Sequence, residues 1–398
     1  MSQGAAGQLW KPSPGMDYLV NKIGSRYEAL GGRKHHDIYY PDLDDVWNDI
    51  VASGYAKTEW GAGEFTVPAT LGIHMNDTVI KGQGEGATYL KQAGGNTNVD
   101  MIEMSDVLDD HYNNLLIRDL TIDGNRDNNT AGRGIKMDCA TTTASTVPYA
   151  YWFHLENVAI RECDEEAIYA NNPSPGNKSI AVARNLRIEE NDGGTTYAQD
   201  VWFNRLFDMH LECFRSSRIR FTNCSAGSIE GLYCGVGGTT TPCMVIDGGV
   251  ADGAAGMSFT DSRFDNTAGI AVRILDNTRR TRFNGCYFTN YDQDDGSPTD
   301  DDTYAALSVE DTSKGIIVND CYFGFEYVKN EMRPKYGIHE IDTTSENHYK
   351  NNTFGYGEIL SSGNDYHMAT AEMNLLAGNG SVGINNTVGG RLPRLIRT

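Results

Sequence analysis

Four carboxylates in neighbouring stretches of the sequence have the types and spacing that glycosidic-bond chemistry needs. They are Asp164, Glu165, Glu190 and Asp192. Hydrolysis of a sugar chain uses one protonated carboxyl and one ionised carboxylate. If the two stretches stack as parallel strands about 4.8 Å apart, Asp164 or Glu165 would face Glu190 or Asp192 across one rung. We predict these four as catalytic residues, with a solvated acidic surface as the alternative.

Two other sets of residues suggest binding sites. An acidic stretch could hold Ca²⁺ through oxygen ligands, although it lacks EF-hand order, and a solvated loop is the alternative. We expect no required cofactor, with Ca²⁺ as the candidate ion. Aromatic side chains could carry sugar rings, or could be buried in a core. The metal candidates are Asp294, Asp295, Asp300 and Asp302, and the ligand-binding candidates are Tyr151, Trp152 and Tyr197.

The elements that must position these side chains form a repeat. Its first unit reads Asn or Asp, two variable residues, then Ile or Phe. A second unit follows, in which a small residue is succeeded by an aliphatic one, a variable one and a usually apolar one. Clear copies of the first unit begin at Asp119, Asn157, Asn185, Asp261, Asp320 and Asn351, and weaker ones at Asn223 and Gly285. The second unit begins at Gly134, Ala167, Gly231, Gly269, Ala306 and Gly337.

This repetition predicts an all-β fold, a right-handed parallel β-helix. Copies of the first unit are 24 to 38 residues apart, which is the scale of stacked structural units. Their short runs alternate with period two, and Asn and Gly favour left-handed turn positions. Helical repeats fit badly because amphipathic helices are missing. We expect equivalent residues to form an internal column, among them Ile122, Ile160, Ile188, Phe264 and Phe323.

The opening of the repeat carries a family resemblance. Residues 42–51 predict one short helix with an Asp-rich first turn, closed by Gly54. A Gly63-Glu64-Phe65-Thr66-Val67-Pro68 strand and an Ile80-Lys81-Gly82-Gln83-Gly84 turn follow. This order resembles the start of the pectate-lyase-like β-helix, which is common in bacteriophage tailspikes and depolymerases.

The resemblance covers roughly residues 41–360, with 41–75 as a capping helix and first strand and 76–360 as the β-helix. Residues 1–40 and 361–398 do not match the repeat, and we expect the first to be a docking or tether segment and the second a C-terminal cap or oligomer contact. The resemblance also implies a homotrimer and, in an active enzyme, polysaccharide hydrolase or lyase chemistry. Residues 336–342 resemble an alginate-epimerase motif, but they lack its Asp-Pro-His order and coincide with the second repeat unit. We interpret them as structural.

Composition limits the partners. The formal net charge is −21, with 54 acidic and 33 basic residues. Phosphate binding needs a basic surface, so we expect neither nucleic acid nor anionic lipid as a partner. The Asp-rich balance resembles proteins from very salty habitats; an ordinary acidic extracellular protein is the alternative. No signal peptide is visible, and no apolar run approaches the roughly 20 residues of a membrane span.

The cysteines indicate a buried column rather than a metal site. There are 8 of them and no CxxC pair, so a zinc site of the usual spacing is not expected. Cys224, Cys286 and Cys321 share one slot of the repeat, which predicts reduced thiols in a core ladder. A Cys234–Cys243 disulfide is the alternative for that pair.

These observations favour a virion spike or tailspike-type attachment protein at the virion surface, with a halophilic virus as one source that would explain the Asp-rich composition. It would bind a host surface glycan or glycoprotein, and its N-terminal segment would bind a virion structural protein. One alternative is a free polysaccharide lyase or glycoside hydrolase of the same fold. Another is a structural virion decoration protein.

Overall fold

A computed structural model of the chain describes most of its strands and consists of two units, residues 1–197 and 198–398. The described residues are 13–31, 38–54, 56–73, 77–95, 97, 99–105, 112–138, 150–171, 178–189, 200–206, 209–236, 241–249, 254–266, 269–289, 305–324, 336–340, 347–354, 382–384 and 387–388.

Unit 1 begins with an antiparallel arrangement that joins its first sheet. β1 (Tyr18–Ile23) pairs antiparallel with β2 (Arg26–Gly31), and β2 pairs antiparallel with β3 (Ile38–Tyr40). β1 also pairs in parallel with β4 (Lys57–Trp60). Part of the stretch expected to be a docking segment is therefore continuous with the first sheet, and its docking role stays a prediction.

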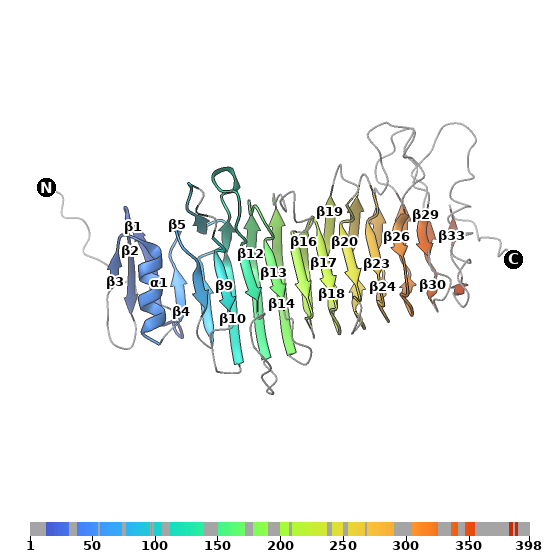
Figure 1. Ribbon diagram of the computed structural model, residues 1–398, viewed down its shortest axis with the longest axis horizontal. Helices are drawn as coiled ribbons and strands as arrows, with labels where there is room; N and C mark the ends of the chain where they lie inside the picture. Colours follow the sequence, from blue (N-terminus) through green and yellow to red (C-terminus); the bar gives the residue numbers. More distant parts are fainter. Residues whose placement is uncertain are drawn as a thin grey trace. The chain divides into compact units, whose positions relative to one another are not determined.

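The predicted helix is present as α1 (Leu43–Ala52). Leu43, Val46, Trp47 and Ile50 form its buried face, and Trp47 Nε1 donates a hydrogen bond to the Gly72 carbonyl at 3.0 Å. α1 contacts β2 and β3 and lies beside them at the start of unit 1 (Figure 1). Among the described residues, no helix has the length and apolar character needed to cross a membrane.

Two sets of parallel strands stack rung on rung in unit 1. Long strands of the first sheet pair residue by residue, so that Ile122 lies beside Ile160 and Ile160 beside Ile188. The first sheet contains β4, β5 (Gly63–Val67), β7 (Thr78–Lys81), β8 (Thr88–Gln92), β10 (Tyr112–Asp123), β12 (Ala150–Arg161) and β14 (Lys178–Glu189). The second contains β6 (Leu71–Ile73), β9 (Ile102–Ser105), β11 (Ile135–Asp138) and β13 (Ile168–Asn171), and the 3₁₀ turn η1 (Arg126–Asn128) precedes β11.

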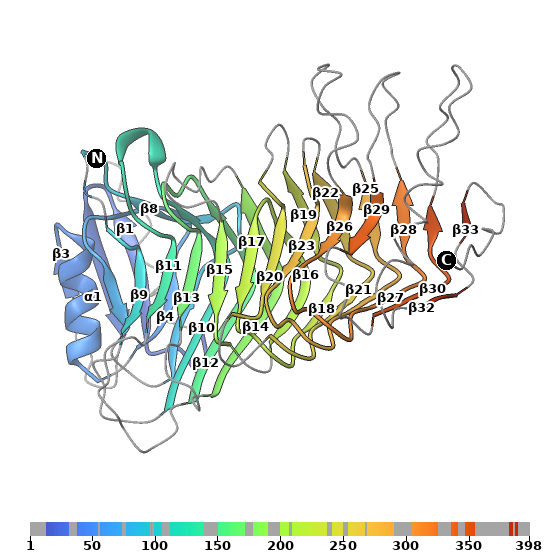
Figure 2. The ribbon, with the colours of Figure 1, turned by 45° about the vertical axis from the view of Figure 1, so that its right-hand side comes forward.

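Unit 2 repeats this plan, and its first sheet bends within each rung (Figure 2). One half of that sheet contains β18 (Ser228–Glu230), β21 (Ser258–Thr260), β24 (Arg282–Asn284), β27 (Ile317–Asn319), β30 (His348–Lys350) and β32 (Val382–Ile384). The other half contains β19 (Tyr233–Val236), β22 (Arg263–Asn266), β25 (Tyr287–Thr289), β28 (Tyr322–Gly324), β31 (Thr353–Phe354) and β33 (Thr387–Val388), and β16 (His210–Ser216) runs through both halves. The second sheet contains β15 (Val201–Asn204), β17 (Ile219–Thr222), β20 (Met244–Asp247), β23 (Val272–Leu275), β26 (Ala305–Val309) and β29 (Tyr336–Glu340).

The first residue of each clear first-unit copy forms the bend of the first sheet. These six residues have φ between 47° and 57°, in the left-handed region that Asn and Asp tolerate best among non-glycine residues. Their side chains also link rungs in unit 1. Asn157 Nδ2 donates to Asp119 Oδ1 at 2.9 Å, and Asn185 Nδ2 donates to Asn157 Oδ1 at 2.9 Å. The repeat in the sequence therefore marks a ladder at the bend.

Three copies lie elsewhere than predicted, and the one at Gly269 is displaced by two residues, since Val272 pairs with Leu307. The second-unit copy at Gly231 is wrong, because Gly231 has φ 64° at the bend and leads into β19 of the first sheet. Asn223, predicted as a weak first-unit copy, follows β17 of the second sheet, and the bend residue of β16 is Cys213 with φ 51°. Glycine can take the left-handed bend position that Asn or Asp fills in the other copies. A Gly at the bend can therefore be mistaken for the small residue that begins the second unit.

The interior of each unit is a stack of equivalent side chains. Ile122, Ile160 and Ile188 are at most 2% exposed and in register in unit 1. In unit 2 the ring of Phe288 lies 5.1 Å from that of Phe264 and 4.6 Å from that of Phe323, between ring centres. The predicted right-handed parallel β-helix is confirmed, since parallel rungs joined in this way are right-handed.

The thiols follow the prediction in part. Cys286 and Cys321 are buried, lie on adjacent rungs directly after bend residues, and are free. Cys224 is also buried and free, but it lies in the turn after β17 and its thiol donates to the Phe203 carbonyl at 3.3 Å. Cys234 and Cys243 are free thiols rather than the alternative disulfide.

Candidate functional site

The second sheet of unit 2 turns one row of side chains outward, one from each rung. Arg220 and Arg273 in this row are 30% and 41% exposed, whereas their strand neighbours Ile219, Phe221 and Ile274 are at most 1% exposed. This alternation follows from the strand, which points successive side chains to opposite faces. The register places in the row Trp202, Arg220, Val245, Arg273, Ser308 and His339.

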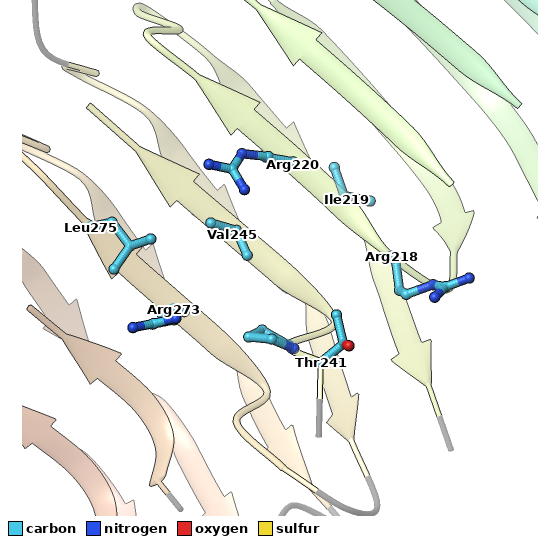
Figure 3. A pocket seen from close by; sticks show the side chains of 8 residues that line it. Arg218, Ile219, Arg220, Thr241, Val245, Arg273 and Leu275 are labelled. Carbon is cyan, nitrogen blue, oxygen red and sulfur yellow. The ribbon is translucent and has the colours of Figure 1, made fainter. Parts of the chain in front are cut away.

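A groove of about 140 Å³ lies on this row where β17, β20 and β23 adjoin. Figure 3 shows Arg220 and Arg273 on either side of Val245. Val245 is shorter than either arginine, so the middle rung forms a low floor between two guanidinium groups. The lining residues are Arg218, Ile219, Arg220, Thr241, Pro242, Val245, Arg273 and Leu275.

Carboxylates hold the two arginines in place. Arg220 Nη2 lies 2.5 Å from Asp247 Oδ2. Arg273 binds Glu310 through both oxygens, at 2.7 Å from Nε and 2.6 Å from Nη2. A guanidinium has five donor hydrogens, and a bidentate carboxylate uses two of them. Each arginine is therefore positioned while it keeps donors outside these contacts.

The Arg273–Glu310 pair stays ionised at neutral pH. Burial raises the pKa of Glu310, but hydrogen bonds from Arg273 and Ser308 outweigh burial and lower the pKa overall. The hydrogen bond to Glu310 in turn raises the pKa of Arg273. The groove therefore keeps a fixed cation on its β23 side.

A titratable carboxyl, Asp200, lies beside the lining residue Arg218. Asp200 is 1% exposed and accepts a hydrogen bond from the Arg218 backbone N–H at 3.1 Å, with Arg218 Nη2 at 3.5 Å from its other oxygen. Burial raises the pKa of Asp200 to about 6, and Arg218 opposes that rise. As the pH falls below about 6, Asp200 loses its charge and neutralises less of the charge of Arg218.

The equivalent face of unit 1 carries a cluster of ion pairs that includes a predicted catalytic residue, Glu165. Glu165 binds Arg133 at 2.9 Å, and Glu166 binds Arg133 Nε at 2.7 Å. Lys136 lies 2.9 Å from Glu103 and 3.1 Å from Asp100. The cluster links neighbouring rungs of the second sheet through ion pairs.

Burial and the neighbouring charges shift the pKa values of two groups in this cluster. Burial lowers the pKa of Lys136, but hydrogen bonds to Glu103 and Asp100 outweigh it and raise the pKa overall, so Lys136 is protonated at neutral pH and cannot act as a base. Burial raises the pKa of Glu166, opposed by the charge of Arg133. Asp164 lies beside Glu165 in the turn between β12 and β13.

Most of the predicted site residues are not described by the structure. Tyr151 and Trp152 lie in β12, but their side chains are outside the described part of the chain. Within that part, no group of His, Cys, Asp and Glu residues could hold a metal ion. The predicted carboxylate pair, ligand-binding residues and Ca²⁺ site stay predictions. The residues wholly outside are Glu190, Asp192, Tyr197, Asp294, Asp295, Asp300 and Asp302.

Residues 336–340 of the stretch that resembles an epimerase motif form β29, and residues 341 and 342 lie outside the described part of the chain. Glu340 is 6% exposed and accepts hydrogen bonds from Asn347 Nδ2 at 3.0 Å and the Tyr349 hydroxyl at 3.2 Å. Burial, followed by the charge of Glu340, raises the pKa of Tyr349. The Glu340 carboxylate thus makes an internal polar contact, and the structural interpretation of the stretch stays a prediction.

The groove arginines do not emerge from the sequence pattern as read above. Val272 lies in register with Leu307, so the second unit of that rung is Ala271-Val272-Arg273-Ile274 and begins two residues later than predicted. The rung before it is Cys243-Met244-Val245-Ile246, which the misplaced copy at Gly231 hides. With the correct register, the third position of each copy gives the outward row.

Solved structures of low sequence identity share the fold. The A-module of mannuronan C-5 epimerase AlgE4 from Azotobacter vinelandii has a TM-score of 0.54 at 15% identity, over 87% of this chain and 90% of that one. The AlgE6 A-module has a TM-score of 0.54 at 12% identity, over 87% and 94%. The enzymatically active domain of tailspike protein 2 from bacteriophage CBA120 has a TM-score of 0.50 at 12% identity, over 88% and 50%.

These likenesses concern the fold. They confirm the predicted resemblance to right-handed parallel β-helix proteins, including a tailspike. The sequence matches no protein-family model and no curated protein. Function must therefore be argued from the site.

Proposed function

We propose that the chain is a glycan-binding protein of the tailspike type and that the unit 2 groove holds an acidic sugar. The observation that carries the proposal is that Arg218, Arg220 and Arg273 all line one hollow in a chain of net charge −21. Guanidinium groups match carboxylates and other planar oxyanions through paired hydrogen bonds. The apolar floor at Val245 suits the C–H face of a sugar ring.

The biological setting is a proposal of wider scope. An attachment protein at the virion surface would present this groove to a host glycan, and its N-terminal segment would bind the particle. A homotrimer is the assembly expected of such a spike. An activity of this chain, if it has one, belongs to polysaccharide hydrolysis or lyase chemistry, since the fold neighbours include a polysaccharide epimerase and an enzymatically active tailspike domain.

A paired substitution tests the groove. Arg273→Gln with Glu310→Gln removes the cation without leaving a buried carboxylate unpaired. The matched control is Arg161→Gln with Asp123→Asn, a pair of similar exposure in unit 1: 40% and 8%, against 41% and 11% for Arg273 and Glu310. Native gels containing alginate, an acidic polysaccharide, or hydroxyethylcellulose, a neutral one, report binding as reduced mobility.

The groove variant should bind alginate about 10- to 100-fold more weakly, since hydrogen bonds to charged groups contribute roughly 1.5–3 kcal/mol each. The control pair should behave as the unmodified chain. Equal weakening by both variants would contradict the proposal. Release of reducing ends or of unsaturated uronate from alginate would add an enzymatic role, and co-purification with virus particles tests the setting.

A further inference from the structure

A second row of outward side chains in unit 2 runs along the first sheet, on β16, β19, β22, β25 and β28. The register places Arg215, Tyr233, Arg263, Tyr287 and Tyr322 on successive rungs, and we name these five residues the tyrosine strip. The guanidinium carbons of Arg215 and Arg263 lie 5.4 and 5.7 Å from the ring centre of Tyr233. The Tyr287 and Tyr322 ring centres are 6.2 Å apart.

Glycines allow two of these rings to lie along the sheet. A Cβ on Gly235 would be 2.8 Å from the Tyr233 hydroxyl, and one on Gly324 would be 2.4 Å from the Tyr322 hydroxyl. No side chain tolerates such distances, so each ring occupies the space beside a glycine two residues further along its own strand. Tyr233 and Tyr322 are half-buried in these positions. Tyr287 is 52% exposed.

We propose that the tyrosine strip binds an extended polysaccharide chain. Sugar rings pack their C–H faces against aromatic faces, and their hydroxyls accept hydrogen bonds from guanidinium groups. Rungs are about 4.8 Å apart, so consecutive side chains of the strip can meet consecutive sugars of a chain running across the strands. The strip is on the first sheet and the groove on the second, so this proposal does not rest on the groove.

The dimensions of the strip favour a polysaccharide over a second copy of the chain. The strip is one side chain wide, because the next outward positions along its strands are the small or buried residues Gly235, Asp265, Thr289 and Gly324. A stable interface between proteins buries roughly 1,200–2,000 Å² in total, which a single row of five side chains does not supply.

The test uses the full chain in native gels containing hydroxyethylcellulose, a neutral polysaccharide that needs no cation. Tyr287→Ala with Tyr322→Ala should weaken retardation about tenfold, since aromatic stacking contributes on that scale for a pair of rings. Tyr287→Phe with Tyr322→Phe keeps the ring faces and should bind within about threefold of the unmodified chain. The matched control is Tyr89→Ala, an outward tyrosine of unit 1 beneath Arg161.

Other results overturn the proposal. These are absence of retardation for the unmodified chain, equal loss in the Tyr89→Ala control, or full retention in the double alanine variant with an unchanged melting temperature. Light scattering of the same variants tests whether the strip instead binds a second copy of the chain. If the double alanine substitution converts an oligomer to a monomer, the strip is an interface between copies. The groove variant with Gln at positions 273 and 310 should keep its hydroxyethylcellulose retardation, which separates this test from that of the groove.

Discussion

The bend ladder gives the sharpest test of how the sequence specifies the coils. Asn157 combines a left-handed backbone, φ 52°, with hydrogen bonds to the rungs on both sides. Asn157→Ala removes both hydrogen bonds and places a Cβ in an unfavourable backbone region. Asn157→Gly removes the same hydrogen bonds but relieves the backbone. The two variants therefore separate the conformational contribution from the hydrogen-bond contribution.

The magnitudes follow from these contacts. Each partly exposed hydrogen bond contributes roughly 0.5–1 kcal/mol, so their loss costs about 1–2 kcal/mol. The left-handed region costs an alanine roughly 1–2 kcal/mol, which glycine avoids and Asn partly avoids. We expect the alanine variant to lose about 2–3 kcal/mol of unfolding free energy and the glycine variant about 1–2 kcal/mol.

Urea unfolding followed by circular dichroism measures both values, with Glu156→Ala as a control on the same strand. Glu156 is half-buried and precedes the bend, so its replacement should cost under about 0.5 kcal/mol. An alanine variant as stable as the glycine variant would refute the role assigned to the left-handed backbone. Two variants as stable as the control would refute the ladder.

Three further outcomes are expected. Phe288→Ala should lose about 3–5 kcal/mol in urea unfolding because it opens a cavity beside Phe323, whereas Phe288→Leu should lose clearly less. Burial raises the pKa of Glu59, but hydrogen bonds from Lys81 and Ser13 outweigh it and bring it to about 2. Glu59 therefore adds at most roughly 3 kcal/mol to the unfolding free energy above about pH 4.5, and this contribution is lost as the pH falls toward 2. In Glu59→Gln the unfolding free energy should depend less on pH in that window. Because the pKa of Asp200 is raised to about 6, alginate oligosaccharides should bind more tightly at pH 5 than at pH 7 in calorimetry, and Asp200→Asn should remove that difference.

The fold was accessible from the sequence because bend residues and core residues recur together. Asn and Asp are among the few non-glycine residues that tolerate the left-handed bend. The bend can therefore be located from the sequence alone at Asp119, Asn157 and Asn185. Where glycine or cysteine takes the bend, as at Gly231 and Cys213, the signal fails and the register of that rung is misassigned.

The groove could not be predicted from the sequence, because the outward position of each second unit is variable in the repeat. Arg220 and Arg273 are 53 positions apart in the sequence and meet only through the rung register, which a shift of two residues hides. The carboxylates chosen from the sequence illustrate the converse. Glu165 has the right chemical type and its catalytic role stays a prediction, but its ion pair with Arg133 is visible only in three dimensions.

A crystal structure of the chain with a mannuronate oligosaccharide tests the central claim most directly. We expect a sugar carboxylate between Arg220 and Arg273, with an oxygen roughly 2.7–2.9 Å from a guanidinium nitrogen. Density for the saccharide at other surfaces of the chain, with the groove empty, would contradict the proposed function.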